Sequence, residues 1–151
     1  GGASAWGISP EIAGYMGIPA LIEESVHTHT ALRKRGVRHL IGGDYGFAWS
    51  AHGQQARDLK YFIDYYGYSP AEALICATRN GGQAMMDGDA LGTLDQGKLA
   101  DLILVNGDVL ANVSILTDPA RIAMVMKDGA IHSLSPALAA QTNTPALEAA
   151  E

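Results

Sequence analysis

The stretch Gly36-Val37-Arg38-His39-Leu40-Ile41-Gly42-Gly43-Asp44-Tyr45-Gly46 is the most informative part of this chain about its fold. Its first half, residues 37–41, is a short β-rich run that predicts a strand. The glycines that follow predict a turn around Asp44. Ligands of parallel α/β folds gather at the carboxyl ends of strands, so Asp44 is the best candidate for a functional residue. A turn aspartate that caps the next segment is the competing interpretation.

Helical patterns flank this stretch on both sides. Residues 22–35 have acidic residues in the first turn and basic residues in the last, which suits the helix dipole. Residues 54–66 carry an apolar stripe at 3–4 spacing. Ser69-Pro70-Ala71-Glu72 predicts a further helix start, because Ser69 is a good N-cap and Glu72 can complete a capping box. Helix, strand, helix and helix in this order indicate the end of an α/β domain.

The character of the sequence changes at Asp87, where short β runs begin to alternate with turns. Leu99–Val105 predicts one strand, and Arg121–Lys127 predicts a second. Asp128-Gly129 is a hairpin dipeptide that predicts a return into a third strand at Ala130–Leu134. The final stretch lacks apolar periodicity and predicts a flexible tail. We therefore expect three regions, at residues 1–86, 87–134 and 135–151.

Composition and charge exclude several classes of protein. Among the 151 residues, the single cysteine, Cys76, excludes an internal disulfide and a cysteine-ligated metal cluster, and we expect it to be a small buried hydrophobic residue. The net charge of −6 gives no basic surface for nucleic acid or anionic lipid. No apolar run approaches the ~20 residues that a membrane span needs. One cysteine fits a cytoplasmic protein, and a secretory signal upstream of Gly1 is the alternative.

Two further histidine patterns are candidates for chemistry. His27 and His29 could share one metal ion on a strand, but on a helix they lie about 200° apart. The surrounding pattern is helical, which favours one surface histidine and one partly buried histidine. His52 follows Asp44 on the same loop and could bind substrate or assist proton transfer. A solvent-exposed loop histidine is the competing interpretation.

A series of short motifs runs through most of the chain. They are residues 36–46, His52-Gly53, Gly67-Tyr68-Ser69-Pro70-Ala71-Glu72-Ala73-Leu74, Ala77-Thr78, Gly92-Thr93-Leu94, Gly97-Lys98-Leu99-Ala100-Asp101-Leu102-Ile103-Leu104 and Val125-Met126-Lys127-Asp128-Gly129. Over roughly residues 22–134, these motifs resemble the metal-dependent amidohydrolase superfamily. Their order and spacing are similar to the imidazolonepropionase-like branch, which includes cyclic-amide hydrolases and Xaa-Pro or Xaa-Arg dipeptidases. Gly43 stands where the family usually has Thr or Ser.

The resemblance implies a (β/α)₈ TIM barrel with one or two divalent metals, usually zinc, and a small composite β-sandwich. The resemblance thus implies an α/β fold. Residues 1–86 would form the C-terminal portion of the barrel, with its last strand at 37–41. Residues 87–134 would form part of the sandwich. Asp44 would be the last metal ligand and the catalytic proton shuttle between water and the leaving nitrogen. His52 and Tyr45 would lie near a small-molecule substrate, a cyclic amide or dipeptide whose C–N bond is hydrolysed.

The other metal ligands of the family, a first-strand HxH, a bridging residue and two later histidines, do not occur at matching positions in this chain. A zinc site takes three protein ligands plus water, so Asp44 alone does not form one. We therefore expect activity only with the missing N-terminal portion of the barrel or a partner chain; a homo-oligomer is a further option. The alternatives are a non-catalytic fragment or β-module acting as an interaction domain, and a metal-binding protein through His27 and His29.

Overall fold

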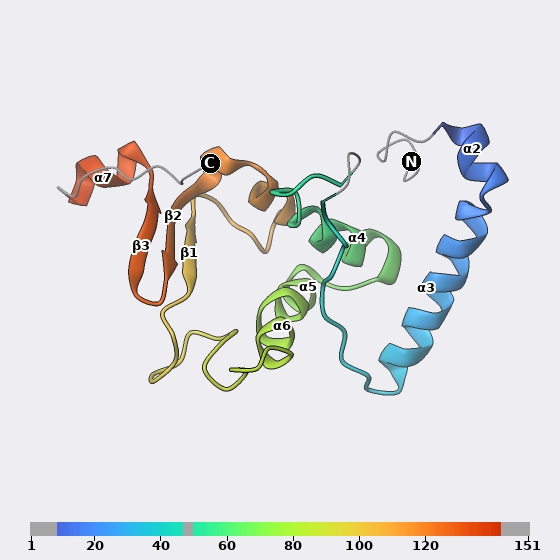
Figure 1. Ribbon diagram of the computed structural model, residues 1–151, viewed down its shortest axis with the longest axis horizontal. Helices are drawn as coiled ribbons and strands as arrows, with labels where there is room; N and C mark the ends of the chain where they lie inside the picture. Colours follow the sequence, from blue (N-terminus) through green and yellow to red (C-terminus); the bar gives the residue numbers. More distant parts are fainter. Residues whose placement is uncertain (1–8, 47–49, 143–151) are drawn as a thin grey trace.

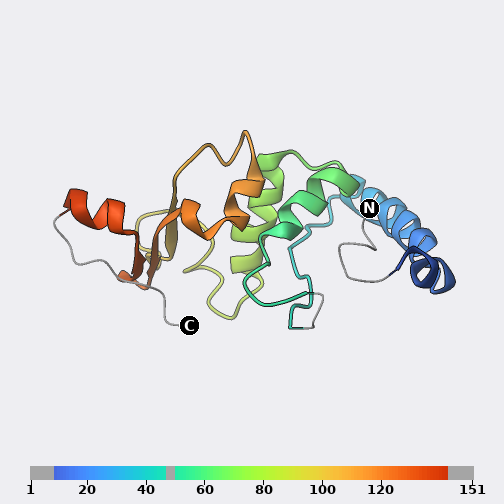
Figure 2. The same cartoon turned by 90° about the horizontal axis from the view of Figure 1, so that it is seen from above.

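A computed structural model describes residues 9–46 and 50–142. The long helix α3 (Ile18–Lys34) lies at one end of the molecule and a small β-sheet with helix α7 at the other, with helices α4, α5 and α6 between them (Figures 1 and 2). None of the helices in these two described stretches combines the length and the apolar character needed to cross a bilayer.

The helices predicted on both sides of the first stretch are confirmed. Helix α3 begins at Ile18, four residues before the predicted start, because Gly17 adopts a left-handed conformation (φ 68°) that separates it from the short helix α2 (Pro10–Tyr15). Helix α4 covers Arg57–Tyr66 and ends at Gly67, which is again left-handed.

The predicted capping box is also present, at the start of helix α5 (Pro70–Ile75). The Ser69 hydroxyl accepts a hydrogen bond from the backbone N–H of Glu72 (3.3 Å), and the Glu72 carboxylate accepts one from the Ser69 N–H (2.8 Å). The helix continues as a π-helical turn, η1 (Cys76–Asn80), and ends in α6 (Gly81–Gln83). Cys76 is 3% exposed, as expected for a buried hydrophobic residue.

The strand predicted at residues 37–41 is not formed. Residues 37–46 run as an irregular segment between α3 and the loop before α4. A strand exists only by pairing with a neighbour, and the one multi-stranded sheet in the described residues is built from segments beyond residue 100. Among the described residues, this region therefore consists of helices and an unpaired segment, and no strand of the expected barrel is formed.

The predicted strands and hairpin of the second region are confirmed. The sheet is antiparallel in the order β1 (Leu102–Val105), β2 (Ile122–Lys127) and β3 (Ala130–Leu134). Asp128 and Gly129 both have positive φ, 49° and 76°, as a type I′ hairpin turn requires. Two 3₁₀ turns, η2 (Val113–Thr117) and η3 (Pro119–Arg121), connect β1 to β2.

The flexible tail predicted from residue 135 is wrong for its first part, because Pro136–Thr142 forms helix α7. Ser135 Oγ accepts a hydrogen bond from the Leu138 N–H (3.3 Å), and Ala139, 6% exposed, packs with the sheet residues Met124 and Leu134. Helix α7 is buried on one side by its contact with the sheet, and the sequence of the tail alone does not predict this contact. Residues 143–151 of the predicted tail lie outside the described residues.

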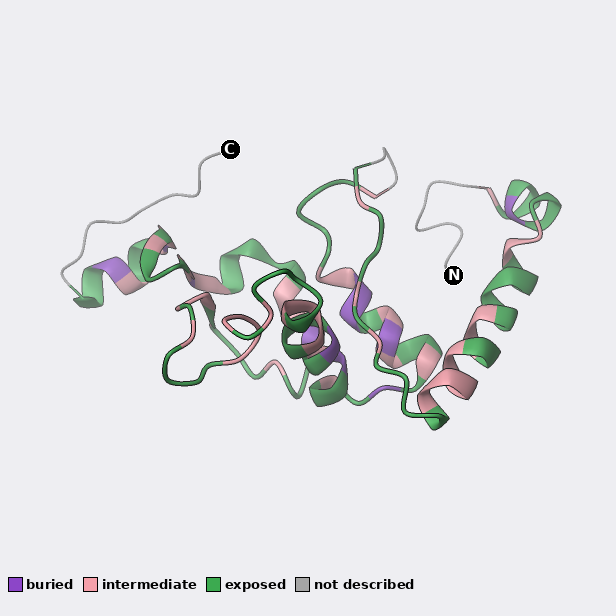
Figure 3. Ribbon diagram, turned by 60° about the horizontal axis from the view of Figure 1, so that its bottom comes forward, coloured by how far each residue is buried: buried purple, intermediate pink, exposed green. Residues whose placement is uncertain are grey.

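Buried residues form two separate clusters. One joins α4, α5, η1 and η2 through Leu59, Phe62, Tyr68, Ala73, Cys76 and Val113. The other lies between the sheet and α7 and consists of Met124, Leu134 and Ala139. Figure 3 shows how few positions along the ribbon are buried, and helix α3 has none.

Candidate active site

Asp44 lies in an exposed turn at the end of the unpaired segment. Its φ of 49° is left-handed, a conformation that aspartate tolerates better than most residues. The Gly46 N–H donates to the Ser50 carbonyl (2.8 Å), and the Ser50 hydroxyl donates to the Asp44 carbonyl (3.4 Å). These bonds close the loop on itself and leave the Asp44 residue exposed.

Tyr45 points its hydroxyl at helix α4, where it donates a hydrogen bond to Oδ1 of Asp58 (2.8 Å). Asp58, in the first turn of α4, is 8% exposed. Burial raises the pKa of the Asp58 carboxyl, and the hydrogen bond from Tyr45 opposes that rise. Burial and the bond to Asp58 also raise the pKa of Tyr45. Tyr45, which the resemblance placed near substrate, thus donates its hydroxyl to Asp58. No sequence pattern had singled out Asp58.

Gly43, on the other side of Asp44, also lies against Asp58. A Cβ atom at position 43 would collide with Oδ2 of Asp58 and with the Tyr45 ring. The absence of a side chain at Gly43 therefore allows the segment to approach α4 closely.

His52 lies on the same loop as Asp44 and is exposed. A methyl group at Gly46 would come within 3.3 Å of His52 Nε2, so the imidazole sits beside a residue two positions from Asp44. Among the sequence candidates, the structure therefore places His52 beside Gly46, and it turns the Tyr45 hydroxyl toward Asp58.

His27 and His29 lie on α3, with His27 exposed and His29 half-buried, as the helical interpretation predicted. The His29 ring stacks on Tyr66, with centroids 4.2 Å apart, and lies 4.7 Å from the His39 ring. Over residues 9–46 and 50–142, no group of three or more His, Cys, Asp or Glu side chains is arranged to hold a metal. Asp44 is thus a single carboxylate here, short of the three protein ligands typical of zinc.

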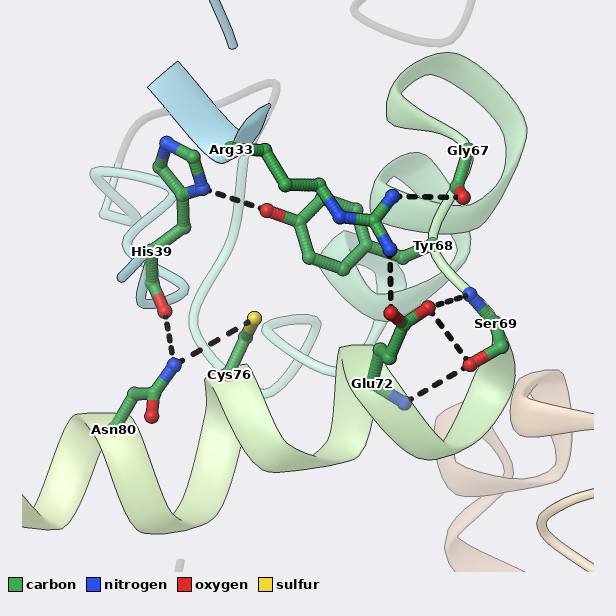
Figure 4. Close-up of polar contacts among 8 residues, drawn as sticks. All are labelled: Arg33, His39, Gly67, Tyr68, Ser69, Glu72, Cys76 and Asn80. Carbon is green, nitrogen blue, oxygen red and sulfur yellow. Dashed lines mark hydrogen bonds and ion pairs between the residues drawn. The ribbon is translucent and has the colours of Figure 1, made fainter. Parts of the chain in front are cut away.

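His39 holds the N-terminal end of the segment 37–46 in place (Figure 4). Its Nδ1 lies 2.6 Å from the Tyr68 hydroxyl, and its carbonyl accepts a hydrogen bond from Asn80 Nδ2 (2.7 Å). Burial, with the nearby His29 and Arg33, lowers the pKa of His39 and so favours its neutral imidazole.

Arg33 joins α3 to the turn between α4 and α5 and to the first turn of α5 (Figure 4). Its guanidinium lies 4.1 Å from the Tyr68 ring centroid and donates to the Gly67 carbonyl (3.0 Å) and to Glu72 Oε1 (2.5 Å). Such cation–π and charge-assisted contacts fix orientation as well as adding stability. Together with His39, they hold α3 and the start of the segment on α5.

A pocket of about 750 Å³ lies between the segment and α4. Asp44, Arg57 and Asp58 supply charged groups, and aromatic rings form much of the remaining wall. Apolar walls with few polar groups are typical of small-molecule sites. The aromatic lining residues are His29, Tyr45, Tyr61, Phe62 and Tyr66.

Comparison with known proteins places these features in one family. The sequence profile of the amidohydrolase family matches residues 18–131. An imidazolonepropionase from Aromatoleum aromaticum is 56% identical over 45 residues, which are 30% of this chain and 11% of that protein.

Solved structures of prolidase-like proteins are also similar to this chain. A candidate prolidase from Bifidobacterium longum is 28% identical with a TM-score of 0.65, covering 70% of this chain and 25% of that protein. A Xaa-Pro dipeptidase with bound methionine is 29% identical with a TM-score of 0.59, again covering 70% of this chain and 25% of the other. An ochratoxinase from A. niger, 24% identical with a TM-score of 0.70 over 78% of this chain and 27% of its own, shares the fold.

The chain thus spans about a ninth of the curated relative and about a quarter of each of these solved structures. The profile match covers about three quarters of this chain and includes both Asp44 and the hairpin turn at Asp128-Gly129. We conclude that the chain belongs to the amidohydrolase family.

Proposed function

We propose that this chain contributes the carboxylate of Asp44 to the catalytic centre of a metal-dependent hydrolase of amide or related C–N bonds. The observation that carries the proposal is the turn itself, an exposed aspartate in a left-handed conformation with its neighbours tied to α4. Family membership supports the reaction class. The remaining ligands and substrate contacts would come from a partner chain or the rest of a longer polypeptide.

A divalent metal, zinc in first place, is part of this proposal. Asp44 fits as one oxygen ligand, and the described residues do not complete the set. When bound, such a metal lowers the pKa of water and polarises the scissile carbonyl. Asp44 would accept the proton of the attacking water and return it to the leaving nitrogen. His52, beside the same loop, would contact the substrate.

The substrate class follows from the named relatives. An imidazolonepropionase and a Xaa-Pro dipeptidase are both similar to this chain. We therefore propose a cyclic amide or a dipeptide as substrate. The aromatic pocket beside Asp44 supports a small ligand with an apolar part.

Native mass spectrometry of the protein as purified from its source tests the assembly and the metal together. We expect a species heavier than the 15.8 kDa chain that carries one or two zinc-mass ions. A lone, metal-free 15.8 kDa species that hydrolyses nothing would contradict the proposal and support the non-catalytic interaction module.

The role of Asp44 is tested in that assembly with imidazolone propionate and a set of Xaa-Pro dipeptides. Asp44→Asn should lower kcat by about 10²–10⁴-fold, the range for a group that transfers a proton in the transition state. Asp64→Asn is the matched control, because Asp64 is an exposed residue on α4 paired with Lys60. Equal activity of Asp44→Asn and wild type would remove Asp44 from the mechanism.

A further inference from the structure

The segment that carries Asp44 needs anchors other than a β-ladder, because residues 37–46 pair with no strand among the described residues. Side-chain contacts hold it at both ends. Near its N-terminal end, the His39 carbonyl is held by Asn80 and the His39 ring by Tyr68 (Figure 4). Next to His39, the Arg38 guanidinium donates to Gln83. The upper anchor, at the C-terminal end of the segment, is the bond of Tyr45 to Asp58.

The upper anchor acts on both neighbours of Asp44 at once. Oδ1 of Asp58 accepts the hydrogen bond from Tyr45, 2.8 Å long. Oδ2 of the same carboxylate lies where a side chain on Gly43 would be. One buried carboxylate is therefore bonded to the residue after Asp44 and lies close to the residue before it, and Asp44 itself is exposed between them.

This arrangement has a cost that needs a reason. Removing a carboxylate from water is unfavourable, and Asp44 adopts a left-handed φ that few non-glycine residues take up. Strained turns persist only where the surroundings hold them in place. The bond between Tyr45 and Asp58 supplies that restraint directly beside the strained residue.

We propose that Asp58, acting through Tyr45, is a positioning residue that sets the orientation of the Asp44 carboxylate. This inference rests on the proposed function for its catalytic half, since Asp44 must take part in the reaction. Its structural half, that the bond holds the 42–46 turn, stands on the contacts alone. Asp58 contacts the loop only at Tyr45 and near Gly43 in this proposal. It takes no part in the proton transfer itself.

Tyr45→Phe tests the structural half, because it removes only the hydroxyl. Hydrogen–deuterium exchange of the purified protein should rise about tenfold or more in peptides that span residues 42–46, where the Gly46 N–H is bonded to Ser50. Peptides from the hairpin, residues 122–134, should not change. Tyr65→Phe is the matched control, an exposed tyrosine on α4. Unchanged exchange at 42–46 would overturn the inference, whatever the activity.

The catalytic half is tested in the assembly with the substrate that wild type hydrolyses fastest. Tyr45→Phe and Asp58→Leu should each lower kcat by about 10–100-fold with little change in KM, the scale expected from a small misplacement of a reacting group. The kcat of the double variant should fall no further than that of either single variant, because each substitution removes the same hydrogen bond between Tyr45 and Asp58. Asp58→Asn keeps an acceptor oxygen and should restore kcat to within about threefold of wild type.

The outcomes separate the two proposals. A rise in KM at constant kcat, or additive losses in the double variant, would overturn positioning and leave the proposed function intact. Faster exchange at 42–46 in Tyr45→Phe, with no hydrolase activity in the wild-type assembly, would support the structural half and overturn the proposed function. Failure of Asp58→Asn to restore kcat would overturn the hydrogen bond as the cause.

Discussion

Asp58 is the only buried charged side chain in the described part of the chain, and its environment makes stability depend on pH. Burial raises its pKa above the ordinary value of 3.8, so the native protein binds this proton more tightly than the unfolded chain. The free energy of unfolding should therefore fall as pH rises through the window above 3.8.

Asp58→Asn removes this dependence and keeps a hydrogen-bond acceptor for Tyr45. We expect the variant to gain stability relative to wild type as pH rises from 4 to 7, measured by urea denaturation at each pH. Asp64→Asn, on the exposed side of the same helix, should show no such trend. A constant difference between wild type and Asp58→Asn across this range would mean that Asp58 does not titrate anomalously.

Glu72 shows the opposite behaviour, with a pKa held down to about 2 by the Ser69 N–H and hydroxyl and by Arg33. A depressed acid pKa stabilises the native state above the ordinary value of 4.5, and this contribution is lost as pH falls toward 2. Glu72→Gln should therefore be less stable than wild type at pH 7 and equal to it near pH 2. Thermal unfolding at both pH values checks this, with the exposed Glu23→Gln as control.

At the scale of elements, the N-cap of α5 is a local feature with a measurable effect. Ser69→Ala removes the acceptor for the Glu72 N–H, and losing such a cap costs about 1 kcal/mol of stability. Urea denaturation should show this loss. Ser69→Asp should recover most of it, because aspartate caps equally well. Equal destabilisation by both variants would point to packing of Ser69 instead of its capping bond.

The hairpin turn offers a second element to test. Gly129 has φ 76°, so Gly129→Ala should destabilise the protein by about 1–2 kcal/mol through backbone strain alone. Gly14, on helix α2, has open space at its Cβ position and no positive φ, so Gly14→Ala should be neutral or stabilising. Denaturation midpoints of the two variants compare the same added methyl group in two backbone conformations.

These elements show which features a sequence can predict. The capping box at Ser69 and the Asp128-Gly129 turn form between residues that are close in sequence, and the prediction of both is confirmed. The strand at 37–41 depends on a neighbouring strand, and local β propensity could not supply one. Helix α7 and Asp58 depend on burial by distant parts of the chain, so no local pattern revealed either.

At the scale of the whole molecule, exposed apolar side chains gather at the end of the described chain that holds α2 and α3. Ile12 and Tyr15 lie on α2, Met16 is its C-cap, and Leu21 and Ile22 lie on α3. Exposed apolar patches mark interaction sites.

We expect α3 to pack against the remaining portion of a hydrolase barrel, because Leu21 and Ile22 are exposed on it in the described chain. Leu21 is 60% exposed, so a charge there costs little in the free chain and would be buried in an assembly. Leu21→Glu should therefore shift the protein from the assembled to the 15.8 kDa species in native mass spectrometry and light scattering. Thr28→Glu adds the same charge at an exposed polar position of α3 and should leave the assembly intact. Loss of assembly in both variants would implicate net charge, and loss in neither would place the interface elsewhere.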